Sequence, residues 1–246
     1  MAQPLLASCG LSEPALPPGL TLVRQHSAVD GSFLIAAVLG HRLKLSRNER
    51  VLLIAAHHSY SHYSSACLKL AYNLGPARDS GQLEIFDVGA EVAQNYPVLP
   101  ALNDIQKRIE TFLEQSPEAT VLIDDLTFLL NFGHSETELI NLVETWVSLA
   151  NAQQSFVIKL NTAELYDWLC DNLVDMAEIE VRLEQLTSGN FREVDGRLNV
   201  SRLNHADSRG ENSLISFRTL EKSLLYKVND RSIKVFVPGE VGIKNV

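Results

Sequence analysis

Asp124 and Asp125 are the two residues best placed to do chemistry, because they directly follow the apolar run of residues 120–123. A carboxylate at the end of a buried strand has the form of a Walker B motif, in which one acid holds Mg²⁺ and a neighbour polarises water. Acids are also common at this place for a simpler reason, since the chain there meets solvent or a helix cap. Without a lysine to hold phosphate, the pattern favours a structural or vestigial role over catalysis.

The loop at residues 26–33 lies between a predicted strand and a predicted helix, where a phosphate-binding P-loop would be found. Such a loop needs glycines, a lysine on the β- and γ-phosphates and a hydroxyl on Mg²⁺. Whether Gly31 is taken as the second glycine or Ser32 as the hydroxyl, the lysine position holds another residue. Asp30 would also repel phosphate. Asp30, Gly31 and Ser32 are therefore predicted to be degenerate nucleotide-loop positions in an ordinary strand-turn-helix.

A cluster of histidines and serines follows the apolar run of residues 51–56. Its members are His57, His58, Ser59, Ser61, His62 and Ser64. Adjacent histidines on a strand point to opposite faces, so one site is not expected to use both His57 and His58. No acid lies within residues 51–78 to orient an imidazole, which weakens a Ser-His-Asp arrangement. We predict polar residues at a strand end and helix start, with no catalytic residue and no metal site.

The composition restricts the classes of protein that fit. The chain has 246 residues and a net charge of −9, from 21 Lys+Arg against 30 Asp+Glu, which argues against coating nucleic acid by bulk attraction. Residues 33–39 are among the longest apolar runs, too short for a membrane span. Three scattered cysteines exclude a disulfide framework or a zinc site and indicate a reducing compartment.

Basic residues outnumber acidic ones only in the segment after Val181, which is rich in turns. Its isolated arginines are Arg182, Arg192, Arg197, Arg202 and Arg209. Such residues suit phosphate or an acidic partner, but they are more often solvated surface or subunit contacts.

Short β-rich runs alternate with longer helical ones from residue 20 onward. Strands are predicted at residues 20–23, 51–56, 83–88, 120–123 and 156–160, and helices at residues 33–45, 61–74 and, behind a capping box of Asn161 and Glu164, up to about residue 176. Gly75-Pro76 is expected to end the second helix, and Ser135 with Glu138 to cap a further one. From residue 179, strands are predicted at residues 179–186, 198–203, 213–217, 224–228 and 233–237, with a hairpin turn at residues 229–231.

This alternation predicts an α/β fold, with a mostly parallel sheet covered by helices on both faces and extended by antiparallel strands at its C-terminal end. No linker or repeat divides the chain, so residues 20–246 are expected to form a single domain. Residues 1–19 hold four of the nine prolines and are expected to form a flexible leader.

A series of short motifs runs from about residue 20 to residue 239. They are Thr21-Leu22 with Asp30-Gly31-Ser32-Phe33-Leu34, Ser61-His62-Tyr63-Ser64, Gly81-Gln82-Leu83, Leu122-Ile123-Asp124-Asp125-Leu126, and then Tyr226-Lys227-Val228, Asp230-Arg231-Ser232 and Phe236 in the closing hairpin. In this order and spacing the chain resembles subunit six of the Elongator complex, a RecA-like family without a standard P-loop. The resemblance implies a RecA-like, P-loop-NTPase-like fold that lacks a functional Walker A motif.

The resemblance further implies a non-catalytic subunit with no cofactor of its own. It would form a hetero-hexameric ring with the fourth and fifth Elongator subunits, two copies of each, and contact the remaining subunits. The ring would bind tRNA and support modification of its wobble uridine, while the chemistry belongs to another subunit. The implied location is cytoplasmic, with the nucleus as a further one. We assign the tRNA contacts to Arg192, Arg197, Arg202 and Arg209, the arginines of the basic segment.

Two alternatives stay open. One is a divergent NTPase that uses Asp124 or Asp125 with an unusual phosphate contact. The other is a RecA-like regulatory binding protein of a different complex.

Overall fold

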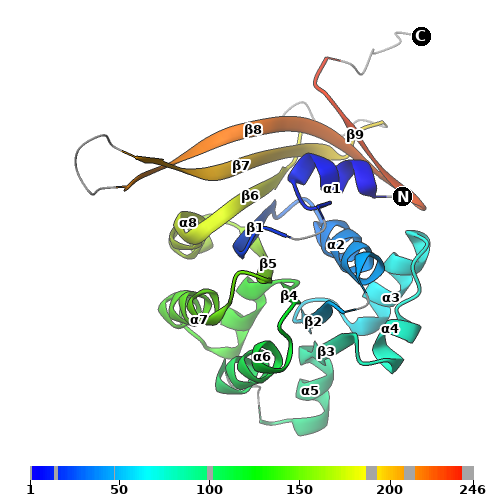
Figure 1. Cartoon of the computed structure of the whole chain (residues 1–246), viewed down its shortest axis with the longest axis vertical. Helices are drawn as coiled ribbons and strands as arrows, with labels where there is room; N and C mark the ends of the chain where they lie inside the picture. Colours follow the sequence, from blue (N-terminus) through cyan, green and yellow to red (C-terminus); the bar gives the residue numbers. More distant parts are fainter. Residues whose placement is uncertain are drawn as a thin grey trace.

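The computed structural model describes residues 2–13, 16–46, 48–98, 102–186, 193–207 and 214–239. These residues form a nine-stranded sheet in the order β3-β2-β4-β5-β1-β6-β7-β8-β9, with helices packed on both of its faces (Figure 1).

The six strands from β3 to β6 in this order make up the parallel part of the sheet. They are β1 (Gly19–His26), β2 (Arg50–Ala55), β3 (Leu83–Asp87), β4 (Ala119–Ile123), β5 (Gln154–Thr162) and β6 (Ala177–Glu184), and each neighbouring pair runs parallel. The apolar runs in β2 and β4 are buried on both faces, as expected of parallel strands covered by helices. The predicted α/β fold with a mostly parallel sheet is confirmed.

The helices form two layers. One face of the sheet carries α1 (Gln3–Cys9), α2 (Ser32–Leu45), α3 (Tyr60–Lys69) and α4 (Gly75–Asp79), and the other carries α5 (Val88–Asn95), α6 (Leu102–Gln115), α7 (Glu136–Leu149) and α8 (Asp167–Met176). The side chains of successive residues in a strand point to opposite faces of the sheet, so Leu22 and Val23 belong to different hydrophobic clusters. The predicted capping box of Ser135 and Glu138 begins α7. None of the helices in the described ranges has both the length and the apolar character needed to cross a bilayer.

Three antiparallel strands extend the sheet beyond β6, as predicted. They are β7 (Gly196–Asp207), β8 (Leu214–Asn229) and β9 (Ser232–Phe236). The strands predicted separately at residues 213–217 and 224–228 are parts of the single strand β8, because β7 pairs with residues 214–226 of it. The pairing continues past one register shift between Val200 and Ser201. The far part of the β7–β8 ribbon projects past α8 (Figure 1).

The expectation of a flexible leader over residues 1–19 is wrong for most of its length. Residues 3–9 form α1, in which Leu5, Leu6 and Cys9 are almost fully buried and join the cluster on the α2 side of the sheet. Pro4 does not prevent the helix, because a proline in the first turn removes an N–H that has no partner in the helix. The helix α1 is therefore part of the packed core.

Two predicted helix boundaries are also wrong. Gly75-Pro76 does not end a helix but begins α4, since Pro76 suits the first turn of a helix. Asn161 does not cap α8, because it lies within β5 and its side chain donates a hydrogen bond to Asp125, which follows β4. The cap residue of α8 is Tyr166, whose side chain makes no cap hydrogen bond.

Candidate functional site

The predicted nucleotide-loop and Walker-B-like residues lie at one edge of the sheet, where the carboxyl ends of β1, β2, β4 and β5 are found. Parallel neighbouring strands place these ends together, and in open α/β sheets this edge is the usual place for ligands. The loop before α2, the acids after β4 and the histidines after β2 are therefore neighbours in space although they are distant in sequence.

Asp30 occupies the beginning of α2. Its carboxylate accepts hydrogen bonds from the backbone N–H and the hydroxyl of Ser32, each at 2.9 Å. Burial would raise the pKa of Asp30, but the adjacent His58 and the hydrogen bonds from Ser32 hold that pKa well below its ordinary value. The helix N-terminus, which would attract a phosphate in a working P-loop, is thus already held by a carboxylate of the chain.

Gly31 is closely packed by side chains of neighbouring strands on the side where a Cβ would lie. Its N–H donates to Oε1 of Gln25 at 2.7 Å, and a Cβ added at this glycine would lie 2.8 Å from Leu183 Cδ1. Side chains of β1 and β6, Gln25 and Leu183, therefore pack against this glycine. Gln25 was not singled out from the sequence, since a glutamine inside a predicted strand carries no signal of its own.

Asp124 joins two strands. It is fully buried, and its carboxylate accepts hydrogen bonds from the backbone N–H groups of Ala56, His57 and His58 at 2.7, 3.0 and 2.8 Å. Tyr63 on α3 donates a further hydrogen bond at 3.2 Å, and burial together with this carboxylate raises the pKa of Tyr63. With its lone pairs used in this way, Asp124 fixes the end of β2 and the start of α3.

Asp125 belongs to a second buried group. It accepts hydrogen bonds from Thr127 and Asn161, and the Nζ of Lys159 lies 3.9 Å from its Oδ2. Burial raises the pKa of Asp125, and the positive charge of Lys159 opposes that shift. Lys159 is completely buried, and its Nζ has no hydrogen-bond partner among the described residues.

The sequence interpretation missed Lys159. The signal was available, because it is the one charged residue in the apolar run of residues 156–160, and a buried lysine requires a partner.

The three histidines stack on one another. The ring centroids of His57 and His58 are 4.3 Å apart, and those of His58 and His62 are 4.1 Å apart. The expectation that adjacent histidines point to opposite faces is wrong here, because β2 ends at Ala55 and strand alternation does not extend to them. The acids absent from residues 51–78 come from other segments, with Asp125 3.9 Å from His57 and Asp30 3.8 Å from His58.

His62 completes the cluster through Ser32, whose Oγ lies 3.2 Å from its Nε2. Burial first, and then the neighbouring His58, lowers the pKa of His62, which favours its neutral form. Within the described ranges, no group of three or more histidine, cysteine or acidic side chains has an arrangement that fits a metal ion.

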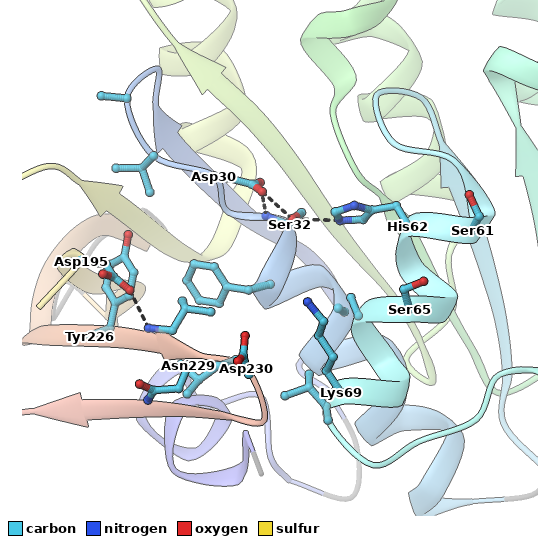
Figure 2. Close-up of a pocket in the computed structure, with 18 residues that line it drawn as sticks. Asp30, Ser32, Ser61, His62, Ser65, Lys69, Asp195, Tyr226, Asn229 and Asp230 are labelled. Atoms are coloured by element: carbon cyan, nitrogen blue, oxygen red, sulfur yellow. Dashed lines mark hydrogen bonds between the residues drawn. The ribbon is translucent and has the colours of Figure 1, made fainter. Parts of the chain in front are cut away.

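A pocket of about 780 Å³ opens beside this edge, between the start of α2, α3 and the β8–β9 hairpin (Figure 2). Asp30, Ser32 and Phe33 border it on one side, and Lys69 reaches towards it from α3. Asp195, Tyr226 and Asp230 border it from the C-terminal strands. The sequence interpretation did not predict this pocket, because nothing in the sequence indicates that the closing hairpin lies against the loop before α2.

Of the four predicted tRNA-contacting arginines, the two that the structure describes lie on opposite faces of β7. Arg192 and Arg209 lie outside the described residues. Arg197 is exposed on β7, whereas Arg202 lies on the opposite face of that strand, next to Gly10, and its Nε bonds to Glu221 at 2.9 Å. An odd separation along a strand places two residues on opposite faces.

Relatives of known complex membership match nearly the whole chain. It is 33% identical over 259 residues to Elongator complex protein 6 of Drosophila melanogaster, covering 99% of this chain and 100% of that protein. It is 28% identical to the Elongator complex protein 6 of Xenopus tropicalis, covering 87% and 88% of the two chains, and 24% identical to that of Homo sapiens, covering 85% and 87%. No family model matches the chain.

The fold also has a counterpart among solved structures. A KaiC-like protein from the archaeon Pyrococcus horikoshii OT3 superposes with a TM-score of 0.59, covering 90% of this chain and 91% of its own, at 9% sequence identity. At this identity the likeness concerns the fold alone, and it confirms the RecA-like architecture.

Proposed function

The chain belongs to the Elongator complex protein 6 family, and we propose that within the complex it is a non-catalytic RecA-like subunit that holds other subunits together. The observation that carries the absence of catalysis is the state of the degenerate nucleotide site. Asp30 occupies the start of α2, and Asp124 is fully engaged by backbone N–H groups. Among the described residues, the loop at residues 26–33 offers no lysine for a phosphate and Asp124 is not free to hold Mg²⁺, which supports the non-catalytic role.

The partners we propose are the fourth and fifth Elongator subunits, arranged with this chain in a hetero-hexameric ring. The ring would contact tRNA and support modification of the wobble uridine by another subunit of the complex. Its location would be the cytoplasm, with the nucleus as a further site. Membership of the family supports these assignments.

The divergent-NTPase alternative has one specific observation in its favour, the lysine beside Asp125. Lys159 is the right residue type to hold a phosphate, and it lies close to the loop, since a Cβ at Gly31 would be 3.5 Å from its Cδ. However, Lys159 is fully buried and its Nζ lies towards Asp125. To reach a nucleotide it would have to leave a buried ion pair, which is costly. We therefore favour the non-catalytic role.

Calorimetry of the full chain with Mg²⁺-ATP tests the absence of catalysis. We expect no binding at micromolar concentrations, for the wild type and equally for Lys159→Met. Micromolar, Mg²⁺-dependent binding that is lost in Lys159→Met would support the NTPase instead.

Affinity purification of the tagged full chain from cells, followed by mass spectrometry, tests the assembly. We expect the other Elongator subunits to be recovered, with the fourth and fifth in similar amounts to the chain. Recovery of an unrelated complex in their place would favour the regulatory binding protein.

A further inference from the structure

The pocket beside α2 carries an excess of negative charge that the proposed function does not use. Four charged side chains border it, Asp30, Asp195, Asp230 and Lys69, together with His62. Asp195 is already engaged, because Lys227 Nζ lies 2.5 Å from its Oδ1 and the Val228 N–H donates to its other oxygen at 2.7 Å. Asp30 accepts two hydrogen bonds from Ser32 but stays largely exposed, and Asp30 and Asp230 together outnumber Lys69, the lysine that borders the pocket.

These two acids are accessible. The side chain of Asp30 is 62% exposed although it caps α2, and Asp230 lies in the exposed turn between β8 and β9. Asp230 makes no hydrogen bond or ion pair with any side chain or backbone group in the described ranges. Its carboxylate is therefore available to a partner. Both acids border the same pocket, Asp30 from the loop before α2 and Asp230 from the turn between β8 and β9 (Figure 2).

Part of the wall of the pocket is apolar, beside serine, histidine and asparagine side chains that also line it. Phe33 and Tyr226 lie with their ring centroids 5.2 Å apart, and Val228, which lines the same pocket, is 37% exposed. An aliphatic chain would cover this surface, and a cation at its end would meet the acids. Lysine and arginine side chains combine exactly this apolar stem with a charged head. Arginine also stacks on aromatic rings.

We propose that this pocket receives a lysine or arginine side chain, presented by a basic segment of a neighbouring Elongator subunit. The inference rests on the proposed function, because it takes its partner from the complex. A nucleic-acid occupant is disfavoured by charge, since phosphates would meet two carboxylates and one lysine. An acidic protein segment is disfavoured for the same reason.

The test measures the affinity of the full chain for the co-expressed fourth and fifth Elongator subunits. The double variant Asp30→Asn/Asp230→Asn is expected to weaken binding about tenfold, because two partly exposed ion pairs are lost. A matched control, Asp104→Asn/Glu114→Gln, changes the charge equally at exposed positions on α6, across the sheet, and should stay within about twofold.

Two further variants decide the sign of the occupant's charge. Asp230→Asn alone, in an exposed turn, is expected to weaken binding about threefold without affecting the fold. Lys69→Met is expected to leave binding unchanged or to tighten it, because it removes a like charge beside the incoming cation. Weaker binding by Lys69→Met together with tighter binding by the aspartate variants would indicate an anionic occupant and overturn the proposal.

The failure of this inference is distinguishable from the failure of the proposed function. If wild type and control bind the subunits and the double variant binds equally well, only the cation pocket is wrong. If the wild type does not bind them at all, the proposed function is wrong and the inference falls with it.

Discussion

At the scale of single residues, aspartates at neighbouring strand ends do different work. Asp124 is fully buried and accepts hydrogen bonds from three successive backbone N–H groups, whereas Asp30 is largely exposed and caps a helix. The residue type and position suggest metal chemistry for Asp124, but its hydrogen bonds give it a structural role. Burial and the supply of donors decide the role of a carboxylate, and neither can be read from its neighbours in sequence.

Replacing Asp124 should therefore affect stability. An amide in Asp124→Asn keeps one acceptor oxygen but turns N–H donors towards backbone donors, so we expect the free energy of unfolding to fall by about 2–4 kcal/mol. Urea denaturation followed by circular dichroism measures this change. The exposed Asp79→Asn should change it by less than about 0.5 kcal/mol. An equal loss in both variants would contradict the role given to Asp124.

The histidine cluster predicts a pH dependence of stability. The pKa of His62 is lowered in the folded state, mainly by burial, so folding favours its neutral form. A group with a lowered folded pKa stabilises the protein above its unfolded pKa, which is about 6.5 for histidine, and this stability is lost as the pH falls below that value. The groups around His62 are Asp30, Asp124, His57 and His58. Asp30, whose pKa is also lowered, acts in the same direction but below about pH 4.

The measurement is the urea midpoint at pH 7 and at pH 5.5. We expect the wild type to be less stable at pH 5.5 than at pH 7. His62→Gln is expected to lose less stability, because the substituted side chain does not titrate. His134→Gln, which changes a histidine outside the cluster, should behave like the wild type. The same pH dependence in both variants would show that His62 does not contribute.

At the scale of elements, most of the strands could be predicted and the N-terminal helix could not. The buried runs of β2 and β4 are apolar throughout, and the capping box of α7 is a local signal carried by Ser135 and Glu138. By contrast, α1 has only seven residues, and so short a helix depends on its packing rather than on its own propensity. Leu5 and Leu6 of this helix indicate a buried position only once it is known that they pack in the hydrophobic cluster on the α2 side of the sheet.

The packing of α1 predicts a large effect of a small change. Leu6→Ala should lower the free energy of unfolding by about 2–4 kcal/mol, because it leaves a cavity in the core. Leu68→Ala is the matched control, since the same atoms are removed from a side chain that is 56% exposed, and it should cost less than about 0.5 kcal/mol. Thermal or urea denaturation compares the two variants. A Leu6→Ala protein as stable as the wild type would mean that α1 does not hold to the core in solution.

At the scale of the whole molecule, the fold class could be predicted but the site's surroundings could not. Strand-helix alternation is a pattern along the chain, so it indicates a parallel sheet with helices on both faces. The pocket depends on the β8–β9 hairpin lying against the loop before α2, and such contacts between distant segments leave no local pattern. The arginines differ, because alternation along a strand separates Arg197 from Arg202, and the strand predicted at residues 198–203 does not include Arg197.

That separation leads to a prediction for the assembled complex. Arg197 is exposed and free of the contacts that hold Arg202 to Glu221, so of the two it is the better candidate for a phosphate contact. We expect Arg197→Ala to weaken tRNA binding by the ring and to reduce the salt dependence of that binding by about one charge. Arg202→Ala should leave the salt dependence unchanged and cost the chain about 0.2–1 kcal/mol of stability, because it breaks a partly exposed ion pair.

The control for the arginines has to be exposed as well. Arg42 is unsuitable, since it is buried and paired with Glu49 at 2.6 Å, whereas Lys107 is exposed on α6. Electrophoretic mobility shifts at several salt concentrations compare Arg197→Ala, Arg202→Ala and Lys107→Ala in the assembled ring. The slope of log affinity against log salt concentration depends on the number of phosphate contacts, because each contact releases counterions. A smaller slope for Arg197→Ala alone would identify this face of β7 as a tRNA contact. If the slope drops equally for Lys107→Ala, the loss reflects net charge, and Arg197 makes no specific contact with the tRNA backbone.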